Sequence, residues 1–191
     1  MEGLLKGITL KVGIIMKKNK PIIETDRIIL REFILDDYNS VYEFGSNKEV
    51  QKYTGDKILT APIQAKKIIT DVVHSDYKTY GYGRWAAIYK PDNKIIGFGG
   101  LKYLPEFNET DIGFRFLPQY WGKGIATEVS KEIIKYGFEV LKLEIIIGIA
   151  DPENIASCRV LEKIGLKFYK IETYDDNDKK FNWYEILNTI Q

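Results

Sequence analysis

Two glycines, Gly122 and Gly124, stand one residue apart in "QYWGKGIATEVSKEI", just before a predicted amphipathic helix. Glycine weakens a helix interior, so this spacing indicates a loop that feeds a helix N-terminus. Such a terminus presents unpaired backbone N–H groups and the positive end of the helix dipole, which together bind anions. Lys123 adds a positive charge and Thr127 a hydroxyl group, so we expect a phosphate site, with a simple strand-to-helix turn as the alternative.

The loop fits neither of two common phosphate motifs. No Gly-Lys-Ser/Thr follows four spacer residues, and no third glycine completes a dinucleotide fingerprint. A second glycine cluster, "IIGFGG" (Gly97, Gly99, Gly100), is followed by "LKYLPEF" and by no predicted helix. We interpret it as a bulge or a close approach of strands.

The segment "DPENIASCRVLEKIG" predicts a second short helix. Asn154 is a good N-cap, and Ser157 follows three residues later on the predicted inner face, with Val160, Leu161 and Ile164. Capping of the helix and a local backbone bond explain this pair without a ligand. Cys158 lies about 100° further round the helix, so we expect an ordinary packed cysteine.

The elements that must position these residues alternate between strands and helices. Two-residue periods and turn signals predict a strand over 26–33, two strands over 83–104 joined by a turn at 91–93, and a strand over 109–117. A continuous apolar run predicts a buried strand over 142–150, and a closing hairpin is predicted over 166–187. Helices are predicted after Leu35, over 61–80 and over 125–140. The apolar residues expected near one stripe of the second helix are Ile63, Ile68, Val72 and Val73. Those expected on one face of the third helix are Ile125, Val129, Ile133 and Val140. The pattern predicts one mixed α+β domain over 20–191, preceded by an N-terminal appendage over 1–19 that could form an edge strand.

Charge, cysteine count and hydrophobicity indicate which partners and which compartment the protein has. The 191 residues carry a formal net charge of +1, which gives no broad attraction to nucleic acid. One cysteine fits a reducing cytoplasm, and no apolar run is long enough to span a membrane. We therefore expect a cytoplasmic protein with no nucleic-acid or membrane partner and no metal, as a monomer or homodimer.

The segments together resemble the GNAT superfamily of N-acetyltransferases, and within it the RimJ/RimL branch that acetylates ribosomal-protein N-termini. The resemblance covers about residues 20–187 and is carried by "ETDRIILREF", "IIGFGGL", "DIGFRFLPQYWGKGIATE" and "DPENIASCRVLEKIGLKF", in family order. Gln119, Gly122 and Gly124 match the superfamily signature Gln/Arg-x-x-Gly-x-Gly/Ala. The resemblance implies a central, mostly antiparallel twisted sheet of about seven strands with flanking helices. This sheet is expected to be splayed between the fourth and fifth core strands.

The resemblance also implies acetyl-CoA as co-substrate, with its pyrophosphate on the glycine loop and its pantetheine arm in the splay. The implied acetyl-CoA-binding residues are Phe114, Phe116, Leu117, Gln119, Gly122, Lys123, Gly124, Ile125, Ala126, Thr127, Asn154 and Ser157. An oxyanion donor is expected among the backbone amides from Phe114 to Phe116.

Direct attack of a neutral amine on the thioester needs a base, an oxyanion donor and an acid for the leaving sulfur. Asp111 stands where the family usually has Glu, and Glu109, which shares its strand parity, is the alternative base. The family pattern implies Ser157 as the acid. We expect His74 to be structural or on the surface, and Arg115 to be an exposed strand arginine, with a position in the acceptor cleft as the alternative.

The branch resemblance, together with a nearly balanced charge, predicts an acceptor that is a peptide or protein N-terminal α-amine. An α-amine has a pKa of roughly 7.7–8.0, against 10.4 for a lysine side chain, so a modest base is sufficient. The main acidic cluster, Asp175 to Asp178, falls in the predicted hairpin turn. The alternatives are acetylation of a small amine (a polyamine, amino sugar or antibiotic) and a non-catalytic acyl-CoA sensor.

Overall fold

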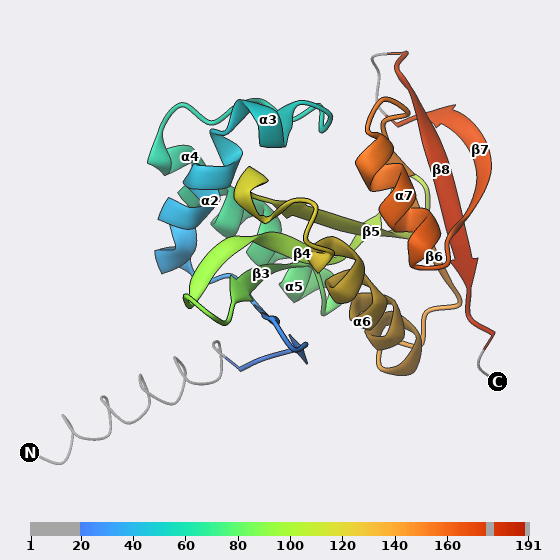
Figure 1. Ribbon diagram of the computed structural model, residues 1–191, viewed down its shortest axis with the longest axis horizontal. Helices are drawn as coiled ribbons and strands as arrows, with labels where there is room; N and C mark the ends of the chain where they lie inside the picture. The colour runs from blue at the N-terminus through green and yellow to red at the C-terminus, as the bar shows by residue number, and fades with distance from the viewer. Residues whose placement is uncertain (1–19, 175–177, 190–191) are drawn as a thin grey trace, which may run out of the picture.

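The computed structural model describes residues 20–174 and 178–189 as one eight-stranded sheet with helices on both faces (Figure 1). The strand order is β1-β2-β3-β4-β5-β6-β8-β7. This is the α+β GNAT fold predicted from the sequence, with eight strands because the two-residue β1 precedes the first predicted strand. The predicted appendage 1–19 and most of the acidic cluster, residues 175–177, lie outside the described residues.

Neighbouring strands are antiparallel except for one parallel pair, β5 and β6. The strands are β1 Ile23–Glu24, β2 Ile28–Arg31, β3 Arg84–Tyr89, β4 Lys94–Leu104, β5 Glu109–Phe116, β6 Ile145–Ala150, β7 Lys167–Thr173 and β8 Lys180–Leu187. β6 is largely buried, as its apolar run predicts, because helix α7 and the β7–β8 hairpin cover it.

The helices form two layers. On one face of the sheet lie η1 Leu35–Asp37, α2 Tyr38–Gly45, α3 Lys48–Gln51, α4 Pro62–Lys67, the π-helical turn η2 Ile68–Val73, and α5 His74–Tyr80. On the other lie α6 Ile125–Glu139 and α7 Ile155–Lys163, with η3 Pro118–Tyr120 before α6. Adjacent residues of β4 show the division, since Phe98 contacts Phe44 of α2 whereas Gly99 lies under Val129 and Ile133 of α6.

The sheet opens between β5 and β6. The β4–β5 ladder runs from the pair Gly97–Phe116 to the pair Leu104–Glu109, whereas β5 and β6 are registered only at Asp111 and Ile147. Beyond Asp111 the rest of β5 diverges from β6. This is the predicted splay between the fourth and fifth core strands, counted from β2.

Two predicted helix faces were partly wrong. Within α4–η2–α5 the buried residues are Ala65, Ile69 and Val73, four residues apart, whereas Ile63, Ile68 and Val72 are exposed. The π-helical turn Ile68–Val73 changes the residue spacing, so a 3.6-residue period misplaces the buried stripe. Val140 is also exposed, because α6 ends at Glu139, whereas Ile125, Val129 and Ile133 are buried as predicted.

The glycines of "IIGFGG" mark close strand approach, as predicted. A Cβ atom on Gly97 would lie 1.9 Å from the carbonyl oxygen of Arg115, and one on Gly100 would lie 2.4 Å from that of Gly83. The β3–β4 register also shifts between Ala87 and Ile88. These glycines therefore let β4 pack closely between its neighbours.

Candidate active site

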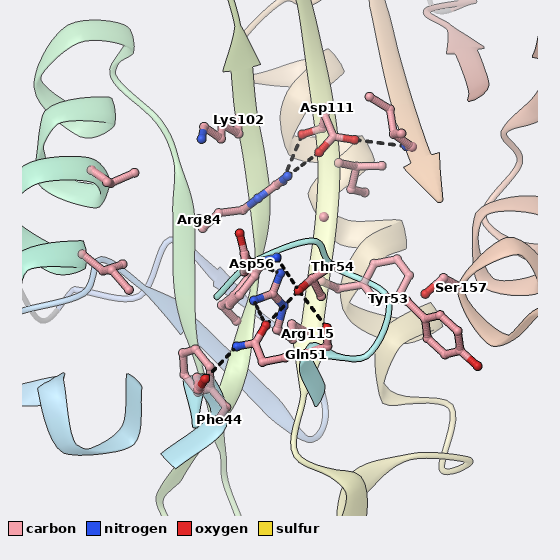
Figure 2. Close-up of a pocket in the computed structure, with 18 of the residues that line it drawn as sticks. Phe44, Gln51, Tyr53, Thr54, Asp56, Arg84, Lys102, Asp111, Arg115 and Ser157 are labelled. Atoms are coloured by element: carbon pink, nitrogen blue, oxygen red, sulfur yellow. Dashed lines mark hydrogen bonds and ion pairs between the residues drawn. The ribbon is translucent and has the colours of Figure 1, made fainter. Parts of the chain in front are cut away.

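A cavity of about 600 Å³ lies where the sheet opens, and residues of both layers line it (Figure 2). The β5 segment 111–115 forms its floor, and Ile149 and Ala150 of β6 form the far edge of the gap. Asn154 and Ser157 reach it from α7, and side chains from α2, the loop after α3, η2 and α5 enclose the opposite side. One cavity therefore joins the predicted thioester site to a cleft on the other face.

The glycine loop precedes α6, and both glycines have left-handed backbone conformations. φ is +71° at Gly122 and +76° at Gly124, which is the residue that caps the helix. A Cβ atom on Gly122 would meet nothing within 4 Å, so the required conformation, rather than a steric clash with the protein, explains the glycine. The Glu128 amide makes the first helical bond, to Gly124 O at 3.0 Å, which leaves the amides of 125–127 without helical acceptors.

The other residues of the predicted donor site lie around this loop. Gln119 and Lys123 are exposed, Ile125 is buried under the loop, and Ala126 and Thr127 are partly buried in the first turn of α6. The loop therefore offers backbone amides, one ammonium group and one hydroxyl group at a single helix end, as the sequence predicts for an anion site.

Phe114, Phe116 and Leu117 can contact a ligand in the splay through their backbone. The side chains of Phe116 and Leu117 are buried, and the Leu117 amide donates to Ile96 O of β4 at 2.9 Å. Because hydrogen-bonding groups alternate sides along a strand, the amides of Phe114 and Phe116 point toward the gap. Trp121 Nε1 donates to Phe116 O at 2.7 Å from that side.

Asn154 caps α7, since its Oδ1 accepts from the Ser157 amide at 3.1 Å. Ser157 lines the cavity, and Figure 2 shows it on the same side as Tyr53. Cys158, by contrast, is on the buried face of α7, with Sγ 3.7 Å from Asp151 O, as expected for a packed cysteine. Asn154 therefore caps the helix, and Ser157 is also exposed to the cavity.

Asp111 lies at the apex of the splay and is bound from two strands. Its Oδ2 pairs with Arg84 Nη2, and its Oδ1 accepts from the Ile149 amide of β6 at 3.3 Å. The Arg84 side chain crosses Gly113, where a Cβ atom would lie 2.5 Å from the guanidinium. Burial raises the pKa of Asp111 above 3.8, although the charge and hydrogen bond of Arg84 oppose this effect.

Glu109, the alternative base, is not among the residues that line the cavity. Its pKa is raised by partial burial and by Glu185, and the ammonium of Lys170 opposes this shift. These neighbours belong to the β7–β8 hairpin, so Glu109 faces that hairpin. Geometry therefore favours Asp111 over Glu109 as the carboxylate at the reaction centre.

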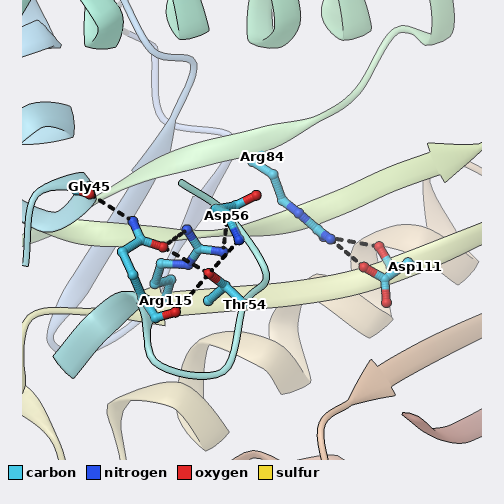
Figure 3. A network of polar contacts seen from close by, with 7 residues as sticks. Gly45, Thr54, Asp56, Arg84, Asp111 and Arg115 are labelled. Carbon is cyan, nitrogen blue, oxygen red and sulfur yellow. Dashed lines mark hydrogen bonds and ion pairs between the residues drawn. The ribbon is translucent and has the colours of Figure 1, made fainter. Parts of the chain in front are cut away.

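Arg115 faces the cleft, and the prediction of an exposed strand arginine was wrong. Its side chain is 19% exposed, and its guanidinium binds Gln51 Oε1 at 3.0 Å and Asp56 Oδ2 at 2.8 Å (Figure 3). Gln51 in turn donates to Gly45 O at 3.1 Å and accepts from Thr54 Oγ1 at 2.9 Å. Arg115 thus ties the loop after α3 across β5, which a strand pattern alone does not show.

Comparison with known proteins agrees with this geometry. Residues 27–167 match the family model described as "Acetyltransferase (GNAT) domain". The chain belongs to the GNAT acetyltransferase family. It is 34% identical over 146 residues to "Uncharacterized N-acetyltransferase YnaD" of Bacillus subtilis (strain 168), covering 76% of this chain and 82% of that protein.

One further match is a solved structure, and another is a protein whose name states its acceptor. The crystal structure of a GNAT-family acetyltransferase from Bacillus anthracis matches with a TM-score of 0.74 and 28% identity, covering 86% of this chain and 97% of that one. A spermidine N(1)-acetyltransferase of Escherichia coli (strain K12) is 26% identical, over 71% of this chain and 70% of its own length. The protein is therefore an N-acetyltransferase, and its acceptor is a separate question.

Sequence reasoning missed the acceptor side of this GNAT site. Arg84, Gln51, Asp56, Asp76 and Lys102 all line the cavity, and none of them belongs to the quoted motifs. Arg84 carried one signal, because it is the only charged residue in the otherwise apolar strand "RWAAIY". Gln51, Asp56 and Asp76 lie in short helices and a loop whose positions relative to β5 depend on tertiary packing, whereas Lys102 lies in β4, opposite Asp111.

His74 is structural, as predicted. Its Nε2 lies 2.9 Å from Phe33 O, and its ring lies beside Tyr77 at a centroid distance of 6.2 Å. In the described part of the chain, no helix is both long and apolar enough to cross a membrane.

Proposed function

We propose that this GNAT protein transfers the acetyl group of acetyl-CoA directly to a peptide or protein N-terminal α-amine, as in the RimJ/RimL branch. The observation that carries the proposal is the single cavity that joins the splay, with Ser157, to a cleft that contains Asp111. An acyl donor and an amine could meet there from opposite faces of the sheet, which direct transfer in a ternary complex requires.

On the donor side, the amides of the glycine loop and of the first turn of α6 would bind the pyrophosphate, assisted by Gln119, Lys123 and Thr127. A diphosphate at this helix end gains from the helix dipole and from backbone N–H groups. The amides of Phe114 and Phe116 would hold the pantetheine arm and the acetyl oxygen, because they point into the gap beside β5. Leu117, Ile125, Ala126 and Asn154 complete the walls.

At the reaction centre, Asp111 would accept the proton of the attacking amine. Arg84 favours the ionised form of this carboxylate and orients it, while burial raises its pKa. A gap-facing amide of β5 would stabilise the negative charge that develops on the acetyl oxygen. The Ser157 hydroxyl, which lines the cavity, would protonate the leaving sulfur, a minor contribution because a thiolate leaves readily.

The acceptor class follows from how the acidic side chains of the cleft are paired. Four aspartates line the cavity, and three of them are in ion pairs: Asp56 with Arg115, Asp111 with Arg84, and Asp151 with Lys179. A polyamine is best collected by carboxylates that are free to bind it. This cleft instead suits an acceptor with one reactive amine, such as a peptide N-terminus.

The test is a comparison of kcat/KM for short peptides with free N-termini against spermidine and an aminoglycoside. The matched control is each peptide with its N-terminus already acetylated, which should release no coenzyme A. We expect the free peptides to be preferred by at least about tenfold, a difference of 1.4 kcal/mol in transition-state binding. A tenfold preference for either small amine would contradict the proposal.

A small amine acceptor is the second candidate, and the spermidine acetyltransferase among the relatives supports it. Structures titled as ribosomal-protein acetyltransferases also match, among them one from Vibrio fischeri with a TM-score of 0.75, but at 17% identity this likeness concerns the fold alone. The paired aspartates of the cleft are the reason for preferring the α-amine.

A further inference from the structure

Arg27 connects the first strands of the sheet to the glycine loop, which lies about a hundred residues away in the chain. It belongs to "ETDRIILREF", a segment with no role in the mechanism above, and it lies in the turn between β1 and β2. Its Nε donates to Glu128 Oε2 at 2.7 Å, and its backbone amide donates to Glu128 Oε1 at 3.2 Å. Its Nη1 donates to Lys123 O at 2.9 Å.

These contacts reach the loop and the helix end at which the diphosphate is proposed to bind. Lys123 stands between the two glycines, and Glu128 lies in the first turn of α6. Arg27 Nη2 lies 3.8 Å from the position of a Cβ atom on Gly124. The Arg27 side chain is 37% exposed, so it supports the loop from the edge of the protein rather than from the core.

The position of Glu128 creates an electrostatic problem for a diphosphate. Partial burial favours a higher pKa for this carboxyl, but hydrogen bonds from Thr25 and Arg27 and the charge of Arg27 outweigh burial and lower the pKa. Glu128 is therefore ionised at neutral pH, at the helix end where a negatively charged ligand would bind. Two anions at one helix terminus repel each other unless a cation lies between or beside them.

We propose that Arg27 is a positioning residue for the diphosphate of the donor. It cancels the charge of Glu128, and it directs the Lys123 carbonyl toward itself, so that the amides of the loop are left to face the ligand. The proposal rests on the proposed function, in which this loop binds acetyl-CoA. It gives the segment "ETDRIILREF" a part in cofactor binding in addition to its part in the sheet.

The test uses four full-length variants: Arg27→Met, Glu128→Gln, the double variant, and Lys90→Met. Lys90→Met is the matched control, because this substitution removes a surface cation that pairs with Glu24 at the same edge of the sheet. The probes are coenzyme A, titrated by calorimetry, and pantetheine, which lacks every phosphate and is titrated by NMR. Thermal unfolding of each variant shows whether it is folded.

We expect Arg27→Met to raise the Kd of coenzyme A roughly tenfold, the order of one charge-assisted hydrogen bond. Glu128→Gln should bind coenzyme A as tightly as the wild type or about threefold more tightly, because it removes the repulsive charge. The double variant should recover most of the loss, and Lys90→Met should stay within about twofold. Pantetheine should bind all four variants equally.

Results that contradict the role of Arg27 can be told apart from a result that contradicts the proposed function. An unchanged Kd for coenzyme A in Arg27→Met, or an equal loss for pantetheine, would show that Arg27 is irrelevant or only a structural anchor. If Arg27→Met does not fold, Glu128→Gln still decides, because an anchoring role predicts weaker binding of coenzyme A by this variant. A wild-type protein that binds no coenzyme A would instead refute the proposed function itself.

Discussion

The two sides of the proposed active site differ in whether backbone or side chains form them. The donor side consists of consecutive backbone, namely the end of β5, the loop 118–124 and the first turn of α6, with the left-handed glycines Gly122 and Gly124. The acceptor side consists of side chains from α2, the loop after α3, η2, α5 and β3–β5, held by the ion pairs Arg84–Asp111 and Arg115–Asp56. The donor side depends on the local backbone conformation of one segment, whereas the acceptor side can change when a single side chain is substituted. Substitutions on the two sides should therefore affect different measurements.

The largest effect is expected from Asp111→Asn, at the boundary between the two sides. Loss of the base should lower kcat by about 10²–10⁴-fold. The Kd of acetyl-CoA should change little, because the carboxylate faces the amine. Stopped-flow kinetics and calorimetry together would separate these effects, with Glu109→Gln as the matched control on the same strand.

The pH dependence sharpens this prediction. Arg84 stabilises the ionised form of Asp111, so Arg84→Met should raise the pKa of Asp111 further. Less carboxylate is then ionised at low pH, and the acid limb of the kcat/KM profile should move to higher pH. The profile should recover at high pH, where both Asp111 and the amine have lost their protons. Equal losses at low and high pH would indicate that Asp111 and Arg84 only position the strands.

A smaller but more selective effect is expected from Gly124→Val. A β-branched residue disfavours φ of +76°, at a cost of about 1–3 kcal/mol, so acetyl-CoA affinity should fall about ten- to a hundredfold. Gly55 is the matched control, because it lies in the acceptor-side loop with φ of +73° and nothing within 4 Å of its Cβ position. Gly55→Val should change the acceptor KM and leave the Kd of acetyl-CoA unaltered. If both variants bind acetyl-CoA equally well, the division between the two sides is wrong.

Arg115→Met should affect only the acceptor side. The substitution removes the anchor of the loop after α3 and leaves Asp56 without its guanidinium partner. We expect the acceptor KM to rise about three- to tenfold, because an ordered loop and a balanced charge are lost, while calorimetry should give an unchanged Kd for acetyl-CoA. Arg115→Lys should recover little, because an ammonium cannot bind Gln51 and Asp56 in the same planar geometry. A selective loss of acetyl-CoA binding would contradict this assignment.

The smallest effect is expected from Ser157→Ala. The hydroxyl lines the cavity, but the amide of this residue, rather than its side chain, binds Asn154, so the helix cap should survive. Because a thiolate leaves with little help, kcat should fall less than about tenfold. Coenzyme A release under saturating substrates is the measurement. A loss as large as that of Asp111→Asn would make Ser157 a principal catalytic group.

Local sequence patterns were sufficient to predict most of the elements and the glycine loop of the proposed donor side. The order of strands and helices follows from hydrophobic periods and turn residues, and the glycine loop follows from two residues whose missing side chains permit left-handed φ at one helix start. The Asn154 cap follows in the same way, because it depends on a neighbour three residues along the chain. Local patterns of this kind can be read without knowing how the chain packs.

The proposed acceptor side could not be predicted in this way, because it depends on contacts between distant parts of the chain. Whether Arg115 lies in water or in a cleft depends on Gln51 and Asp56, which are about sixty residues away, and whether Asp111 can act depends on Arg84 and on the Ile149 amide. Packing also decided which apolar side chains of the π-helical turn Ile68–Val73 are buried, namely Ile69 and Val73, and which are exposed, namely Ile68 and Val72. Charge pairing and burial arise from residues that are distant in sequence, and their combined effect on a pKa or on an acceptor is set only when the sheet brings them together.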